Sequence, residues 1–309
     1  MSARVIVTGA SGGIGGAATA ALRARGARVI GLDLVADPAN DVLACDVRDQ
    51  ASVDGAVAEA IERLGGLDVL VNNAGIGIPQ SAGLAPDAEA LAVIDVNLLG
   101  PWRVTAAALP ALRAERGRVV NVASGLAHLT VPFATAYCMS KRGLVGYSDA
   151  LRMEHGDAIT VTTVYPGYIR TAIHDASRER GVGLEGAVPA EKLSDAARTL
   201  VRAALGPPAR DLATTRFGSV SYAIVRRLPA RLIDRVGNRQ LRRLARKGHF
   251  ASSPIAAEFN ARLGGSVLAS GDAGERQRRT KLLSEPDDDQ HNPDQHRHRA
   301  RAAQDAADR

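Results

Sequence analysis

The chain has 309 residues, of which 46% are hydrophobic and 23% charged, and no apolar run approaches the roughly 18 residues of a membrane-spanning helix. The net charge of +6 is concentrated between Arg216 and Gly248, where ten Arg or Lys residues accompany one acidic residue, Asp234. Only 3% of the residues are aromatic, so this basic segment lacks the stacking side chains of a nucleic-acid-binding surface, and we expect no nucleic-acid partner.

The amino-terminal segment and the number of cysteines indicate in which cellular compartment the protein is expected. The opening "MSARVIVTGASGG" lacks a basic region followed by a long apolar stretch, so a secretory signal is not expected. Cys45 and Cys138 are the only cysteines, which excludes a disulfide framework. We therefore expect a protein of the reducing cytoplasm.

The first 205 residues alternate between short apolar runs and helical patterns. Apolar, β-branched runs predict strands at 4–9, 27–33, 67–75, 117–124 and 159–167. Helices are expected at 14–25, 50–64, 87–115, 134–156 and 189–205. Continuous apolar strands that alternate with helices indicate a parallel sheet covered on both faces. The sequence thus predicts an α/β fold with a doubly wound parallel sheet, in a single domain over residues 1–215.

Residues 216–263 have a different character and are expected to form a basic, amphipathic extension. Pro229 is suited to open a helix on which Leu228, Leu232 and Val236 form one row, with Arg227, Arg231 and Arg235 beside it. We favour a row that packs on the domain or on a sister subunit. The alternative is a weak peripheral contact with anionic membrane. Residues 264–309 are polar and biased, and we expect them to be disordered.

A glycine-rich turn follows the first strand. Gly9, Gly13 and Gly15 permit a sharp turn, a close approach of phosphate to the backbone and tight packing of the next helix. The second strand ends at Asp33, whose carboxylate is placed to accept hydrogen bonds from ribose hydroxyls and to repel a 2′-phosphate. Leu34 follows, and the turn holds no cation. NAD is therefore the expected cofactor, and NADP is the alternative.

The ordered motifs make this sequence similar to the short-chain dehydrogenase/reductase family. The resemblance covers about residues 3–205, and the fold that it implies is Rossmann-type. It rests on "TGASGGIG" (8–15), "CDV" (45–47), "NNAG" (72–75), Asn97, Ser124, "YCMSK" (137–141) and "PGYIRT" (166–171). The resemblance implies a nicotinamide dinucleotide held by Gly9, Ser11, Gly13, Ile14, Gly15, Asp33, Asp46, Val47, Asn73, Ala74, Gly75, Tyr137, Lys141, Pro166, Gly167, Ile169 and Thr171.

Tyr137 and Lys141 lie one helical turn apart, on one face of the predicted helix. On its own such a pair is usually a half-exposed phenol beside a solvated cation. The family resemblance instead implies that Tyr137 is the general acid/base, with a pKa lowered by the Lys141 cation. It further implies that Ser124 holds the substrate oxygen. Asn97, where an amide is not needed for packing, would hold a water that links Lys141 to solvent.

The substrate side of the predicted cleft is apolar. We expect it to be lined by Ala127, Leu129, Val131, Phe133, Ile173 and Val182, with Arg170 and His174 as polar exceptions and residues 172–188 as a lid. This lining favours a lipophilic secondary alcohol or ketone, such as a steroid, a retinoid or a long-chain compound. The alternatives are an NADP-linked carbonyl reductase and a non-catalytic redox sensor. A homodimer or homotetramer is typical of the resembling family, and no metal is expected.

Overall fold

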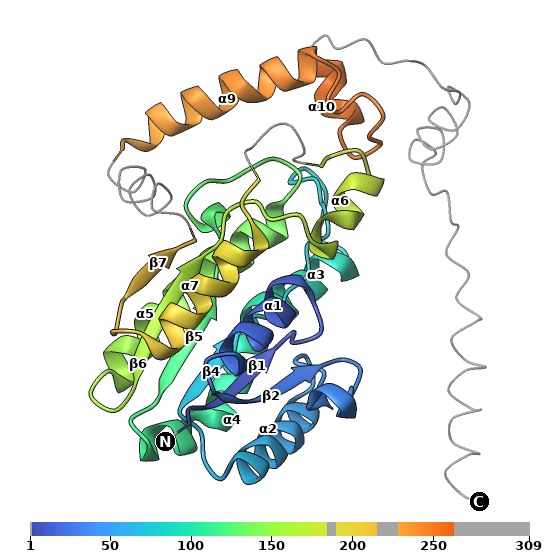
Figure 1. The fold of residues 1–309 in the computed structure, drawn as a ribbon. Helices are drawn as coiled ribbons and strands as arrows, with labels where there is room; N and C mark the ends of the chain where they lie inside the picture. Colours follow the sequence, from blue (N-terminus) through green and yellow to red (C-terminus); the bar gives the residue numbers. More distant parts are fainter. Residues whose placement is uncertain (1, 184–189, 215–227, 263–309) are drawn as a thin grey trace, which may run out of the picture. The chain divides into compact units, whose positions relative to one another are not determined.

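The computed structural model describes residues 2–183, 190–214 and 228–262. Seven parallel strands form one sheet in the order β3-β2-β1-β4-β5-β6-β7 (Figure 1). Their bounds are β1 Arg4–Thr8, β2 Arg28–Asp33, β3 Val42–Ala44, β4 Val69–Asn72, β5 Arg118–Val122, β6 Thr160–Tyr165 and β7 Asp211–Ala213. The predicted doubly wound parallel sheet is confirmed, and the strand order reverses between β1 and β4, where such sheets bind their ligands.

Helices cover both faces of this sheet (Figure 1). Those of the main domain are α1 Gly13–Arg23, α2 Gln50–Leu64, α3 Ala88–Ile94, α4 Gly100–Ala114, α5 Thr135–His155, α6 Asp175–Glu179 and α7 Leu193–Leu205. Beyond them lie α9 Ala230–Arg246 and α10 Ala257–Arg262. As predicted, α9 begins directly after Pro229, whose fixed φ is compatible with a helix start. No helix in the described ranges is both long and apolar enough to cross a membrane.

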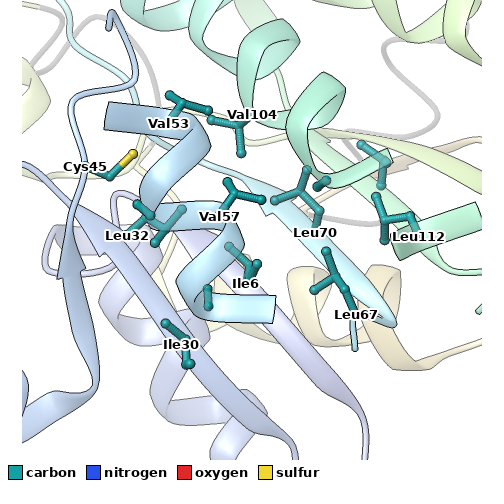
Figure 2. Close-up of a cluster of buried hydrophobic side chains, with 14 of the residues drawn as sticks. Ile6, Ile30, Leu32, Cys45, Val53, Val57, Leu67, Leu70, Val104 and Leu112 are labelled. Atoms are coloured by element: carbon teal, nitrogen blue, oxygen red, sulfur yellow. The ribbon is translucent and has the colours of Figure 1, made fainter. Parts of the chain in front are cut away.

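Successive residues of β1 supply two separate apolar cores. Val5 and Val7 face α1 and α7, while Ile6 points to the opposite face, where α2 and α4 pack. Figure 2 shows this second core, in which Ile6 and Leu70 from the sheet meet side chains of the helices. Because both faces are buried, a strand needs apolar residues at every position, which explains the unbroken apolar runs in the sequence.

The structure contains two strands that the sequence patterns did not indicate. β3 and β7 each have three residues and pair with only one neighbour, at opposite edges of the sheet. The helix expected at 87–115 is also interrupted, because a π-helical turn over Asp95–Leu99 separates α3 from α4. The tail expected to be disordered, 264–309, lies outside the described residues.

A third apolar cluster joins the extension to the main domain. It contains Phe133 and Val182 from the domain and Ala245, Phe250 and Ala256 from the extension, all buried. The ring of Phe133 lies edge-on to the rings of Phe250 and Phe259, with centroids 5.6 and 5.7 Å away. The carboxyl-terminal half of α9 and the turn that follows are thereby packed on the domain.

We expect replacement of Leu112 with Ala to lower the free energy of unfolding by about 2–5 kcal/mol, because its fully buried side chain fills the core between α4 and the sheet. Urea unfolding, followed by circular dichroism, measures the change. Leu84→Ala serves as the matched control, since the Leu84 side chain is largely exposed. Equal losses in the two variants would contradict this description of the core.

Candidate active site

One pocket of about 1180 Å3 opens at the carboxyl-terminal ends of the strands. It runs past the ends of β2, β1, β4, β5 and β6, and so crosses the point at which the strand order reverses. It brings together most of the residues singled out from the sequence: Gly9, Gly13, Ile14, Asp33, Asp46, Val47, Asn73, Ala74, Gly75, Ser124, Tyr137, Lys141, Pro166, Gly167, Ile169 and Thr171. Ser11, Gly15 and Asn97 are not among the lining residues.

The glycine turn packs so closely on its neighbours that side chains would not fit. Gly9 has φ of +65°, and a Cβ on it would lie 2.9 Å from the Cα of Ala74. A Cβ on Gly15 would lie 2.0 Å from the carbonyl oxygen of Gly9. Gly15 therefore serves the packing of α1 rather than the pocket wall. The result is a helix amino terminus at the pocket wall, with free backbone N–H groups suited to phosphate.

Asp33 is held at the end of β2 by two backbone donors. Its carboxylate accepts hydrogen bonds from the backbone N–H of Ser11, at 2.9 Å, and of Leu34, at 2.8 Å. Ser11 thus contributes by fixing Asp33. The carboxylate nevertheless lines the pocket, so its remaining acceptor sites are available to a ligand there.

Asp46 pairs with Arg48, a pocket residue that the sequence analysis did not identify. The guanidinium of Arg48 lies 2.7 Å from the Asp46 carboxylate, and this hydrogen-bonded pair holds the pKa of Asp46 below its usual value. Asp46 and Val47 both line the pocket near Asp33. The cation in this part of the site is therefore already engaged by a carboxylate.

Asn73 ties the end of β4 to the glycine turn. Its side-chain amide donates to the carbonyl oxygen of Thr8, at 3.0 Å, and its backbone N–H donates to the Thr8 hydroxyl, also at 3.0 Å. The backbone N–H of Ala74 donates to the same hydroxyl. The Asn73 side chain thus clamps two loops of the pocket together, and its contact with a cofactor stays a prediction.

Ser124, Tyr137 and Lys141 converge at the middle of the pocket. Ser124 follows the end of β5, whereas Tyr137 and Lys141 lie one turn apart on α5. The Lys141 ammonium is buried, donates to the backbone carbonyl of Val122 at 2.9 Å, and lies 5.8 Å from the centre of the Tyr137 ring. A hydrogen bond joins the Ser124 and Tyr137 side chains. A hydroxyl, a phenol and an ammonium thus share one wall of the pocket.

The electrostatics of this cluster differ from the expectation that Lys141 lowers the Tyr137 pKa. Loss of solvent raises the pKa of Tyr137 to about 12, and the hydrogen bond from Ser124 opposes this effect only in part. Loss of solvent also lowers the pKa of Lys141 from 10.5 to about 8. Burial therefore dominates both pKa shifts, and the protein alone favours a neutral phenol.

Asn97 is also placed differently from the expectation. The π-helical turn buries it completely, and its amide donates to the carbonyl oxygen of Ile76, at 2.9 Å, and to the Ser140 hydroxyl, at 3.2 Å. Its amide oxygen accepts from the backbone N–H of Ile76. The expectation that packing does not need this amide is wrong. A Cβ on Gly75 would lie 3.2 Å from the Asn97 oxygen and 3.5 Å from Lys141 Nζ, so these groups are close neighbours.

The substrate side of the pocket is confirmed only in part. Leu129, Val131, Ile173 and His174 line it as expected. Ala127, Phe133, Arg170 and Val182 are not among its lining residues. Phe133 and Val182 are buried in the apolar cluster that packs the extension on the domain. Ala127 packs against Ala123 and Tyr165. The expected lid, 172–188, lies partly outside the described residues.

Several pocket residues were missed because they belong to no motif. Leu126, Ala172, Ala190, Glu191, Lys192 and Asp195 complete the wall around Ile173 and His174. Glu191 accepts a hydrogen bond from the backbone N–H of Gly167, at 3.0 Å, and another from the Thr214 hydroxyl. A Cβ on Gly167 would lie 2.5 Å from the Glu191 carboxyl carbon. Glu191 thus fixes the Pro166–Gly167 turn from a distant segment, which no local pattern could indicate.

Among the described residues, no group of three or more His, Cys, Asp or Glu side chains is arranged to hold a metal ion.

Comparisons with known proteins place this site in a family context. The short chain dehydrogenase family model matches residues 3–181. Human retinol dehydrogenase 16 is 37% identical over 191 residues, which cover 57% of this chain and 59% of that relative. The 3-oxoacyl-acyl-carrier-protein reductase FabG of Salmonella typhimurium is 33% identical over 204 residues, 62% of this chain and 84% of the relative.

Solved structures agree with the sequence comparisons. A short chain dehydrogenase from Burkholderia cenocepacia, in complex with NADP, superposes with a TM-score of 0.61 at 28% identity. The superposition covers 71% of this chain and 90% of that structure.

We expect the stability of the wild type relative to Lys141→Met to rise as the pH is raised from about 8 to 10.5. In that window the unfolded chain still binds the lysine proton and the folded protein does not, so the free energy of unfolding increases with pH. Urea unfolding at half-unit pH steps measures the difference. Lys247→Met, at an exposed position, should show no such trend. If the difference in free energy of unfolding between the wild type and Lys141→Met does not change with pH, the lowered pKa of the buried ammonium is wrong.

Proposed function

Because the chain belongs to the short-chain dehydrogenase/reductase family, we propose that it transfers hydride between NAD(H) and a lipophilic secondary alcohol or ketone. The observation that carries this proposal is the convergence of Ser124, Tyr137 and Lys141 in the same pocket as the glycine turn. A binding protein that performs no reaction has no need to hold a buried ammonium beside a phenol, because the burial costs stability.

The residues of the pocket fit a dinucleotide in their chemistry. The amino terminus of α1, free of side chains at Gly12 and Gly13, is suited to a pyrophosphate. Asp33 would bind the adenosine ribose, and Asp46 with Val47 would flank the adenine. Lys141 and Tyr137 would hold the nicotinamide ribose, while Ile169 and Thr171 would hold the carboxamide. When bound, the dinucleotide supplies the hydride acceptor or donor and, in its oxidised form, a positive charge.

The proposed chemistry divides the proton transfer among three side chains. Tyr137 removes the hydroxyl proton of the alcohol in oxidation and donates a proton to the carbonyl oxygen in reduction. Ser124, already hydrogen-bonded to the phenol, holds the substrate oxygen beside it. The ammonium of Lys141 stabilises the phenolate from the protein side. Ser140 and the backbone of Ile76 fix Asn97 near Lys141, where it completes the polar wall.

Because the pKa of Tyr137 is high in the protein alone, the pocket has to supply a further positive charge before the phenol can act as a base. A phenol with a pKa of about 12 is a poor base at neutral pH. A second positive charge close to the ring would favour the phenolate, in addition to that of Lys141. We therefore propose that Tyr137 becomes an effective base only in the complex with the oxidised cofactor, which limits proton removal to the state that can accept a hydride.

The preference for NAD over NADP rests on charge around Asp33. Its carboxylate faces the pocket, and the adjacent Leu34 is 64% exposed and offers no cation. Arg48, the nearest pocket cation, is paired with Asp46. A 2′-phosphate would meet the Asp33 carboxylate and would have to compete with Asp46 for Arg48. The Burkholderia cenocepacia structure contains NADP, so this choice is one on which related proteins can differ.

A lipophilic substrate is supported by the apolar wall opposite the cofactor side. Leu126, Leu129, Val131 and Ile173 line the same pocket as Tyr137 with hydrocarbon. His174, whose ring lies tilted against that of Tyr168 with centroids 4.7 Å apart, adds a polar group, and the charged residues Glu191, Lys192 and Asp195 lie in the same wall. A wall of this kind stabilises an apolar substrate body by removing it from water. The name of the retinol-oxidising human relative is consistent with a substrate of that class.

The Tyr137→Phe variant should lose at least about 99% of the NAD-linked turnover of secondary alcohols, because general acid–base catalysis contributes roughly 100- to 10,000-fold. Absorbance of the reduced nicotinamide, measured across a panel of aliphatic, steroid and retinoid alcohols, provides the assay. NADH should still bind to the variant, as measured by fluorescence titration. Full activity of Tyr137→Phe would exclude the proposed role, and NADH binding without turnover by the wild type on any alcohol would indicate a redox sensor.

The double variant Asp33→Ser/Leu34→Arg should shift the preference from NAD towards NADP. It removes the carboxylate that repels a 2′-phosphate and adds a guanidinium that binds one, which together should change the ratio of the two kcat/KM values by about 100-fold or more. Asp54→Ser/Leu84→Arg makes the same charge change at exposed positions and is the matched control. A wild type that already prefers NADP would refute the assignment of Asp33.

A further inference from the structure

The amino-terminal half of α9 presents apolar side chains to solvent. Leu232 and Val236 lie one turn apart on this helix and are 43% and 59% exposed, and Leu228, just before it, is 39% exposed. The expectation that this row packs on the domain is therefore wrong for the described chain. The domain packs instead against the carboxyl-terminal half, through Leu241, Leu244 and Ala245.

An arginine stripe accompanies this apolar row. α9 contains six arginines and one aspartate. Arg231, Arg235, Arg239, Arg242 and Arg246 are spaced by three or four residues, and all five are exposed. None of them forms an ion pair with a side chain that the structure describes. These five arginines thus share one cationic side of the helix beside the row of Leu232 and Val236, and the sixth, Arg243, lies on the side of that apolar row.

The carboxyl-terminal half of α9 is packed on the main domain, and this holds the helix that carries the arginines and the apolar row. Ala245 and Phe250 are buried against Phe133 and Val182, so the carboxyl-terminal half of the helix is held by the main domain. Phe133 lies only two residues after Val131, which lines the pocket. The cluster that anchors α9 therefore includes a residue close in sequence to the pocket wall.

We propose that the exposed half of α9 docks on the surface of an anionic phospholipid bilayer. Such a surface presents phosphates to the arginine stripe and, directly beneath them, hydrocarbon to Leu232 and Val236. Guanidinium groups bind phosphate oxygens through paired hydrogen bonds. A nucleic acid offers phosphates without an adjoining apolar phase, and a second copy of this chain would bring its own arginines against this stripe. The proposal concerns binding alone and does not depend on the proposed reaction.

Flotation of the full chain with phospholipid vesicles tests this proposal. Vesicles of phosphatidylcholine with one quarter phosphatidylglycerol should carry at least about ten times more protein than vesicles of phosphatidylcholine alone. The bound fraction on the anionic vesicles should fall steeply when sodium chloride is raised from 50 to 500 mM, roughly as surface charges are screened. No preference for anionic vesicles would overturn the proposal.

Two variants separate the roles of the arginines and the apolar row. Arg231→Gln/Arg235→Gln/Arg239→Gln should reduce the anionic preference by about tenfold or more, and Leu232→Ser/Val236→Ser should reduce binding at every salt concentration. The control removes three exposed arginines elsewhere, as Arg25→Gln/Arg113→Gln/Arg116→Gln, and should bind like the wild type. Thermal unfolding at unchanged midpoint verifies that each variant is folded.

Three outcomes would refute the lipid surface as the partner. Equal loss in the control triple variant would mean that binding follows net charge alone. Unchanged vesicle binding by Leu232→Ser/Val236→Ser, with a smaller mass in analytical ultracentrifugation, would identify an interface between copies of the chain. Unchanged vesicle binding by that variant, together with heparin binding that only the Arg231 triple variant loses, would identify a site for a soluble polyanion.

Discussion

The buried ammonium of Lys141 is the constraint on which the arrangement of the pocket depends. A lysine that is 3% exposed must be compensated, and among the described residues its hydrogen-bond acceptor is the carbonyl oxygen of Val122, at the end of β5. This bond ties Lys141, on α5, to the end of β5, and Tyr137, one turn earlier on α5, lines the same pocket as Ser124, two residues after Val122. Gly75 lies close to this ammonium and to Asn97, because a Cβ there would be 3.5 Å from Nζ and 3.2 Å from the Asn97 amide oxygen.

The same burial sets the electrostatics of the proposed reaction. Removal from water disfavours both the phenolate of Tyr137 and the ammonium of Lys141, so it raises the pKa of the phenol to about 12 and lowers the pKa of the ammonium to about 8. We infer that a cationic ligand is needed to reverse the balance at Tyr137. The clamp formed by Asn73 and Thr8 holds the start of the glycine turn to the end of β4, in the wall of the same pocket.

The sequence predicted what depends on local patterning and missed what depends on distant partners. Five strands and the glycine turn are visible because their residue types follow from burial on both faces and from a sharp turn. β3 and β7 were missed because three edge residues carry too little periodicity. The interruption at Asn97 and the hydrogen bonds of Glu191 follow from tertiary contacts 21 to 24 residues away in the chain. Phe133 and Val182 were predicted to line the pocket, but they are buried against residues of the extension that are distant in the sequence.

The pKa of the Tyr137 phenol, with and without oxidised cofactor, tests the account most directly. Labelling the five tyrosines with 13C at Cζ gives one resonance for each, and Tyr137→Phe assigns the relevant one. We expect a pKa of about 12 in the protein alone and a value below roughly 9 when NAD is bound, within reach of a working base. A pKa that remains near 12 in the complex would contradict the proposal that Tyr137 acts as the cofactor-dependent base.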